Sequence, residues 1–183
     1  MKLDSTRNRG RGRDRGHIQH PPACTAIRMA ANQPEPSRLL SIQSHVVSGY
    51  VGNRSATFPL QLLGWDVDVI NTVQFSNHTG YGRWQGQRFD ESHVRSLFAG
   101  LERNGLLKQS RMLSGYMPSP GVVQAVKDAV EEIRKHSPDL VYLCDPVMGD
   151  MGRGAYVDIA VLPVYKSMLP LTTIITPNQF EAQ

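Results

Sequence analysis

The chain has 183 residues, of which 40% are apolar and 20% charged, a composition typical of an ordinary folded domain. Its longest apolar stretches are far shorter than the roughly 20 residues that span a bilayer, which argues against a membrane protein. The formal net charge of +4 comes from residues 1–37, which hold 7 basic and 3 acidic residues, whereas residues 38–183 hold 13 of each. The excess of basic over acidic residues therefore belongs to the first segment and not to the rest of the chain.

Residues 1–37 contain an arginine- and glycine-rich run at 9–16 and several prolines, with no apolar periodicity that could build a core. We expect this segment to be a disordered arm. Arginine-glycine segments can bind nucleic acid, but one short run without aromatic residues does not predict nucleic acid as a partner. A transit peptide is a further alternative, against which Asp4 and Asp14 count. A solvated tail or a misassigned gene start is the preferred interpretation.

The two cysteines lie in different settings, which predicts no disulfide. Cys24 is in the polar arm, and Cys144 ends an apolar run. A reducing compartment fits this usage, and we expect a cytoplasmic protein.

From residue 38 onward, short apolar runs alternate with helical segments, the pattern of βαβ units. We therefore predict an α/β fold with a mostly parallel sheet flanked by helices, built by residues 38–183. The expected strands are 38–43, 66–71, 110–114, 140–144 and 172–175.

Four helices are expected between these strands. Asn53 is predicted to cap the first, which ends at Gly64. Asp90 is predicted to cap the second, with an apolar face and a stop at Gly105. The third begins at Ser119 and the fourth covers 158–168. The apolar face of the second helix comprises Val94, Leu97, Phe98 and Leu101, and that of the third comprises Val123, Val126, Val130 and Ile133.

Ligands of open parallel sheets bind beyond the carboxyl ends of the strands, so the loops there are the place to expect a site. These loops cover 44–52, 72–80, 115–118, 145–153 and 176–181, and they hold most of the polar and glycine residues that packing does not explain. The first loop opens a helix but matches neither a Rossmann nor a Walker glycine pattern. Glycine alone therefore does not indicate a nucleotide site.

Several of these segments closely resemble pyridoxal kinases of the ribokinase-like superfamily. The similar runs are SIQSHVVSGYVGN at 41–53, QFSNHTGY at 74–81, SGY at 114–116, CDPVMGD at 144–150, LPVYK at 162–166 and TPNQFE at 176–181. They occur in the family's order and extend over residues 38–183. The runs at 144–150 and 176–181 also suit hydroxymethylpyrimidine kinases, whereas the first two favour pyridoxal kinases.

The resemblance implies transfer of the ATP γ-phosphate to the 5′-hydroxyl of pyridoxal, pyridoxine or pyridoxamine, the salvage route to pyridoxal 5′-phosphate. The positions that match the family's substrate pocket are Ser44, Thr79 and Tyr116, with Val51, Phe75 and His78 around the ring. A flat pyridine ring suits aromatic or aliphatic walls and a few fixed hydroxyl partners. For His78, the residues alone favour a hydrogen bond that holds the loop.

The resemblance also implies positions for ATP and a metal ion. Those that match are Asp145, Asp150, Thr176, Asn178 and Glu181, of which Asp145 and Glu181 are the expected metal ligands. The cofactors implied are ATP and Mg²⁺ or another divalent cation, and a monovalent cation stays open. The family's members are typically homodimers. The alternative for Asp145 and Asn178 is a turn or helix cap.

The chain departs from the family's pattern in two places. The Gly-Thr-Gly-Asp run, which in the family supplies an anion hole and the general base, is missing, so the isolated chain is expected to be inactive. Ile159 and Ala160 stand where many relatives have acidic residues. The alternatives are a hydroxymethylpyrimidine kinase and a non-catalytic partner that binds vitamers or pairs with a complete kinase.

Overall fold

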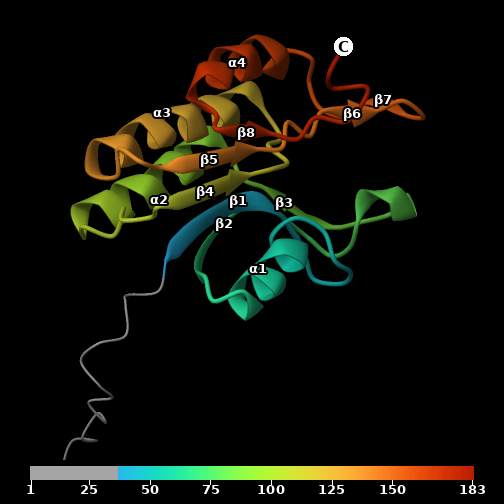
Figure 1. Ribbon diagram of the computed structural model, residues 1–183. Coiled ribbons are helices and arrows are strands. Elements are labelled where there is room, and N and C mark those ends of the chain that lie inside the picture. The colour runs from blue at the N-terminus through green and yellow to red at the C-terminus, as the bar shows by residue number, and fades with distance from the viewer. Residues whose placement is uncertain (1–36) are drawn as a thin grey trace, which may run out of the picture. The chain divides into compact units, whose positions relative to one another are not determined.

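The computed structural model describes residues 37–183, and the expected arm at 1–37 lies outside the described residues apart from Ser37. The central element is a six-stranded sheet of order β3-β2-β1-β4-β5-β8 (Figure 1). All neighbouring strands run parallel except β3, which is antiparallel to β2. The predicted α/β class with a mostly parallel sheet is confirmed. The strands are β1 (Arg38–Val46), β2 (Asp66–Phe75), β3 (Gly86–Arg88), β4 (Arg111–Ser114), β5 (Val141–Cys144) and β8 (Ile174–Ile175).

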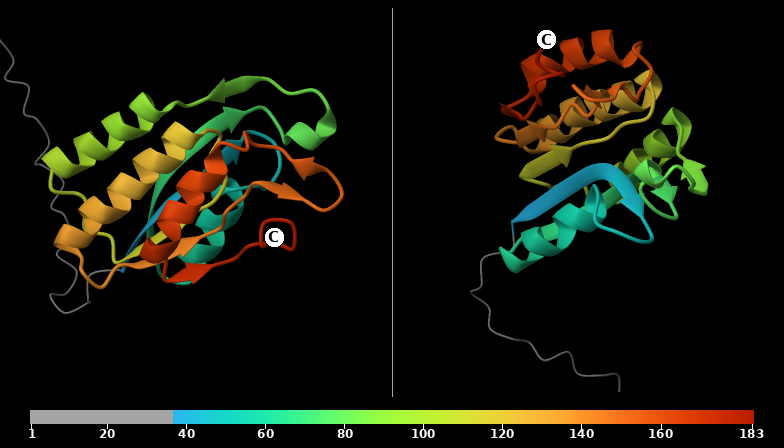
Figure 2. Two further views of the ribbon diagram at one scale, coloured as in Figure 1. Left: turned by 90° about the horizontal axis from the view of Figure 1, so that it is seen from above. Right: turned by 90° about the vertical axis from the view of Figure 1, so that its right-hand side faces the viewer.

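Helices cover both faces of the sheet. α2, α3 and α4 lie side by side on one face and α1 lies on the other, as Figure 2 shows. A two-stranded hairpin of β6 (Gly149–Asp150) and β7 (Gly154–Ala155) stands apart from the sheet. The helices are α1 (Asn53–Leu62), α2 (Glu91–Arg103), α3 (Pro120–His136) and α4 (Val161–Met168), with short 3₁₀ turns η1 (Thr79–Tyr81) and η2 (Leu169–Leu171).

The main core lies between the sheet and the layer of α2, α3 and α4. Leu40 and Ile42 of β1 are fully buried there, and so is the predicted stripe of α3. Each such side chain contributes about 1.5–3 kcal/mol by leaving water. On α2, Val94 and Phe98 are buried, but the prediction for Leu97 is wrong, because its side chain is 38% exposed.

Of the two predicted helix caps, one is correct, and the predicted start of the third helix is correct as well. The Asp90 carboxylate accepts a hydrogen bond of 2.9 Å from the backbone N–H of His93, and Ser119 precedes Pro120 at the start of α3. Asn53 is not a cap: α1 has no side-chain cap. Its buried amide instead bonds to the Ser41 hydroxyl at 2.8 Å and to the carbonyl oxygen of Ile70 at 2.8 Å, because the helix begins directly against β1 and β2.

The first two strands are longer than the sequence predicts. β1 continues to Val46 and β2 to Phe75, past a β-bulge where Gln43 pairs with Asn71 but Ser44 pairs with Val73. The second halves of both strands contain polar residues, so the pattern of apolar residues does not indicate that the strands continue. Ser44 and Phe75 therefore lie on strands and not in loops.

The last predicted elements are shorter than expected. α4 begins at Val161, not at residue 158, because the Asp158 carboxylate accepts a hydrogen bond of 2.9 Å from the Ala160 N–H and forms a turn first. The final strand begins at Ile174, since Thr172 ends η2. Within the described residues, no helix has the length and apolar character to cross a membrane.

Candidate functional site

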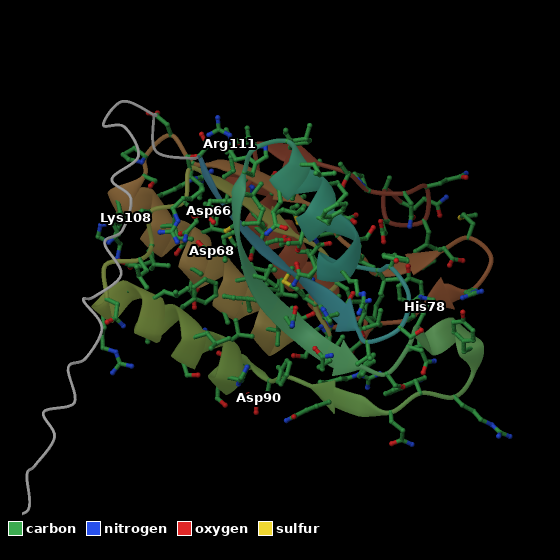
Figure 3. All side chains as sticks on the ribbon, turned by 90° about the horizontal axis from the view of Figure 1, so that it is seen from below. Asp66, Asp68, His78, Asp90, Lys108 and Arg111 are labelled. Carbon is green, nitrogen blue, oxygen red and sulfur yellow. The ribbon has the colours of Figure 1, made fainter. Side chains whose placement is uncertain are left out.

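A cavity of about 520 Å³ opens at the carboxyl ends of β1, β2 and β4. His78 lies at this end of the sheet, whereas Asp66 and Asp68 lie at the opposite end, as Figure 3 shows. All six residues predicted for the substrate pocket line this cavity: Ser44, Val51, Phe75, His78, Thr79 and Tyr116. They come from three separate segments of the sequence, which the parallel sheet brings to one edge.

The floor of the cavity follows from strand alternation across β1 and β2. Ser44 pairs with Val73 and Val46 with Phe75, so these four side chains share one face of the sheet. The bulge leaves Thr72 as the extra residue of β2. Its buried hydroxyl donates a hydrogen bond of 2.7 Å to the carbonyl oxygen of Tyr116. The irregularity in the sheet therefore holds the loop that carries a predicted pocket residue.

The apolar wall is an aromatic pair. The ring centroids of Phe75 and Trp84 lie 4.4 Å apart at an interplanar angle of 38°. Val51 and Tyr116 pack against the same small cluster, which is separate from the main core. This arrangement offers flat apolar surfaces to a ring-shaped ligand.

Gly52 allows the loop after β1 to close against Ser44. Its φ is +52°, and a Cβ at this position would lie 2.2 Å from the carbonyl oxygen of Ser44 and 2.5 Å from its hydroxyl oxygen. Only glycine fits so close to the strand. The Ser44 hydroxyl is thereby kept at the mouth of the cavity, beside the start of α1.

η1 and the residue before it form the outer wall. The Nδ1 atom of His78 accepts a hydrogen bond of 3.1 Å from the backbone N–H of Gly80. The loop-holding role that the residues alone favour for His78 is confirmed. The side chain also lines the cavity, and Thr79 beside it is exposed there.

The predicted nucleotide and metal residues lie on two neighbouring loops beyond β5 and β8. Glu181 joins these loops, because one carboxylate oxygen accepts from the Met148 N–H at 2.8 Å and the other from the Asn178 N–H at 3.0 Å. The Asn178 amide donates to the carbonyl oxygen of Gly149 at 2.7 Å. Its side-chain oxygen also accepts from the N–H groups of Phe180 and Glu181. These bonds close a turn and not a helix cap, because no helix follows Asn178 in the described residues.

Asp145 lies in the loop that follows β5, and the pKa of its carboxyl group is raised. Burial raises the pKa of its half-buried carboxyl, and the negative charge of Glu181 raises this pKa further, against a lowering by the Thr176 side chain. No lysine or arginine of residues 37–183 forms an ion pair with Asp145 or Glu181. Two carboxylates near each other without a cationic side chain suit a bound cation. A cluster of three or more metal-ligating side chains is not found in the described part of the chain.

Asp150 differs from the other residues that are predicted to bind ATP or a metal ion. One carboxylate oxygen accepts from the N–H groups of Gly152 at 2.9 Å and Arg153 at 2.8 Å, which shapes the turn between β6 and β7. Asp150 lines the cavity described above, whereas Asp145, Thr176, Asn178 and Glu181 do not.

Sequence reasoning missed other residues of the cavity: Val46, Gly52, Val73, Gly80, Trp84, Arg88, Val147, Arg153 and Tyr156. Val46 and Val73 follow from alternation once the true strand ends are known. Trp84 lies four residues beyond the predicted loop at 72–80 and could have been suspected as an aromatic wall. Nothing in the sequence pattern pointed to Arg88, since β3 was not predicted.

A mostly parallel sheet covered on both faces, with a cavity and a carboxylate-bearing loop pair at its carboxyl edge, is the architecture of an α/β protein that binds its ligand beyond the strand ends. The chain is 52% identical over 153 residues to human pyridoxal kinase and 49% identical over 150 residues to that of Arabidopsis thaliana, with 81% of the chain covered in each case. No protein-family model matches the chain. By sequence and fold the chain is a homologue of these pyridoxal kinases.

Solved structures agree with the sequence relatives. The pyridoxal kinase of Leishmania donovani, solved with ADP and pyridoxamine, matches 79% of the chain at a TM-score of 0.76 and 46% identity. The enzyme from Trypanosoma brucei matches 81% of the chain at a TM-score of 0.73 and 40% identity. The chain covers 52% of each of these structures and 49% of the human sequence, so it spans about half the length of its relatives.

Proposed function

We propose that this chain provides the vitamer-binding part of a pyridoxal kinase, which transfers the γ-phosphate of ATP to the 5′-hydroxyl of pyridoxal, pyridoxine or pyridoxamine. The supporting observation is the single cavity that Ser44, Thr79 and Tyr116 line together with apolar Val51 and Phe75. The ADP and pyridoxamine named for the Leishmania donovani relative support extending this ligand pair to the chain.

Each residue type has a task toward a substituted pyridine. The ring would pack against the Phe75 and Trp84 pair, because flat apolar surfaces favour stacking. The hydroxyl groups of Ser44, Thr79 and Tyr116 would pair with the ring nitrogen and the polar substituents, which fixes the orientation of the 5′-hydroxyl.

We further propose that Asp145, Asp150, Thr176, Asn178 and Glu181 serve ATP and a divalent cation. Asp145 and Glu181 fit a cation, because burial and the negative charge of Glu181 both raise the pKa of Asp145, and a cation would offset both effects. Mg²⁺ is commonly bound by one or two carboxylates, with waters and substrate phosphates as the other ligands. Bound there, the cation would neutralise charge on the phosphates during transfer. A monovalent cation stays open.

Calorimetric titration of the 183-residue chain tests the vitamer site. We expect pyridoxine to bind with one site per chain, and hydroxymethylpyrimidine to bind more weakly. Thr79→Val and Tyr116→Phe should each weaken pyridoxine binding by about 5–50-fold, the worth of one or two hydrogen bonds, and leave ATP binding unchanged. Loss of ATP affinity with intact pyridoxine binding would contradict the assignment of the cavity.

The polypeptide of these 183 residues is expected to form at most traces of pyridoxal 5′-phosphate. It contains no Gly-Thr-Gly-Asp run. Loss of a general base removes about 10²–10⁴-fold in rate, and loss of anion-hole donors removes a comparable factor. Product formation with ATP and Mg²⁺ near the rate of a complete pyridoxal kinase would show that the catalytic groups lie elsewhere.

Two further properties are extended to the chain from its resemblance to the family: a homodimeric state and a cytoplasmic location. Sedimentation at increasing concentration checks the first, and imaging of the tagged chain in its host cells checks the second.

A further inference from the structure

We propose that Arg88 and Arg153 make the cavity select vitamers by charge, so that anionic and neutral vitamers bind better than pyridoxamine, whose aminomethyl group is cationic. The inference rests on the proposed vitamer site and names which members of its substrate class the site prefers. Arg88 and Arg153 thereby become specificity-determining residues.

Arg88 holds its charge against the aromatic wall. The guanidinium carbon lies 5.5 Å from the ring centroid of Trp84 and 5.9 Å from that of Phe75. These are the distances of cation–π contacts, which favour Arg over other side chains above aromatic rings. A ligand ring that packs on this wall therefore lies next to a positive charge.

Arg153 brings a second positive charge from a different element. It lies in the turn between β6 and β7, and its guanidinium reaches η1, because a methyl group on Gly80 would lie 3.6 Å from the Arg153 Nη1 atom. Both arginines line the cavity, Arg88 from β3 and Arg153 from the hairpin. Within residues 37–183, no carboxylate forms an ion pair with either guanidinium. Their charges are therefore available to a ligand.

The opposing charge in the cavity is smaller. Asp150 is the one acidic residue in its lining, so two arginines less one aspartate leave a formal +1. A carboxylate oxygen of Asp150 is already engaged by two backbone N–H groups.

The size of the cavity makes this charge effective. In a space of about 520 Å³, no group of a bound vitamer can be far from both guanidinium groups. Two unit charges about 7 Å apart change a dissociation constant about threefold in surroundings like water, and roughly 50-fold at the effective dielectric of a partly enclosed site. We therefore expect pyridoxamine to bind the chain at least about threefold more weakly than pyridoxine.

The test uses three ligands that share one ring and differ in charge at the 4-substituent: 4-pyridoxate, pyridoxine and pyridoxamine. Their dissociation constants for the 183-residue chain are measured by calorimetry at low and high salt. The expected order of affinity is pyridoxate, then pyridoxine, then pyridoxamine, with differences that shrink as salt screens the charges. Arg88→Gln and Arg153→Gln should each reduce the difference in affinity between pyridoxine and pyridoxamine. Arg88→Lys retains the positive charge and should keep this difference.

Arg103→Gln is the matched control, because Arg103 is exposed on α2 and does not line the cavity. It should leave all three affinities unchanged. Equal affinities in the unmodified chain, or a gap that Arg88→Gln and Arg153→Gln leave intact, would overturn the inference while the proposed vitamer site stands. If none of the three ligands binds, both proposals are wrong. If Arg88→Gln does not fold, Arg153→Gln and the salt dependence of the unmodified chain test the charge selectivity of the cavity.

Discussion

The Thr72 hydroxyl donates a hydrogen bond of 2.7 Å to the carbonyl oxygen of Tyr116, and this bond links the bulge of β2 to the loop after β4. Thr72 is fully buried, so the bond is shielded from water. The main-chain position of Tyr116 in the cavity therefore depends on a residue that does not line it.

Replacing Thr72 with Val should weaken both the fold and the pocket. The substitution keeps the shape but leaves the Tyr116 carbonyl oxygen without its partner, which costs about 1–3 kcal/mol. We expect this loss in the free energy of unfolding, measured with urea, and several-fold weaker pyridoxine binding. Thr72→Ser retains the hydroxyl and should restore the affinity. Equal pyridoxine affinity for the Val and Ser variants would show that this bond does not position Tyr116.

Asp145 should lower the stability of the chain near neutral pH. Its folded-state pKa is raised by burial and by Glu181, so the folded state holds the proton more tightly than the unfolded state does. Its contribution is therefore favourable below the unfolded pKa and is lost as the pH rises through the folded pKa. Asp145→Asn should raise the free energy of unfolding near neutral pH, by less than about 1 kcal/mol because solvent screens the half-exposed group.

Urea unfolding at neutral and at acidic pH checks this sign. The advantage of Asp145→Asn should fade as the pH falls below the ordinary range of carboxyl pKa values. Asp139→Asn, at an exposed position before β5, is the control and should show little change at either pH. Destabilisation by Asp145→Asn at neutral pH would mean that the carboxylate stabilises the loops.

The edge strand β8 should make the 183-residue chain prone to aggregation. β8 is the last strand of the described sheet, and its Ile174 and Ile175 are 47% and 41% exposed. Exposed apolar edge strands pair with other chains, and a lysine on such an edge opposes this. Ile174→Lys should therefore lower the rate of aggregation measured by light scattering.

A matched control separates edge pairing from general hydrophobicity. Ile159 is 69% exposed but lies in the turn before α4 and not in the sheet. Ile159→Lys should change the aggregation rate less than Ile174→Lys. An equal effect of the two substitutions would contradict the role of the edge.

The sequence predicted the parts of the fold that repeat a simple pattern. The α3 stripe, the Asp90 cap and the alternation of strands and helices along the chain follow from periodicity and local hydrogen bonding, which depend on neighbouring residues only. Asn53 shows the limit of such reasoning. Its side chain bonds to residues of two strands that are distant in sequence, and no local pattern reports this.

The candidate site was predictable to the same extent. Ser44, Thr79 and Tyr116 were named from runs of sequence, and they line one cavity. Arg88 was missed because it depends on β3, a strand of three residues that forms only by pairing with β2. The double role of Glu181 between two loops also required the tertiary structure, since Met148 lies 33 residues away.

The central claim, that the cavity beside Trp84 binds a vitamer, is tested most directly by tryptophan fluorescence. Trp65 and Trp84 are the two tryptophans of the chain, and Trp65 lies against Arg111, which is outside the cavity lining. Two single-tryptophan variants, Trp65→Phe and Trp84→Phe, are titrated with pyridoxine. We predict a saturable change in emission when Trp84 alone remains and none when Trp65 alone remains. A response from Trp65 only, or from neither residue, would contradict the account.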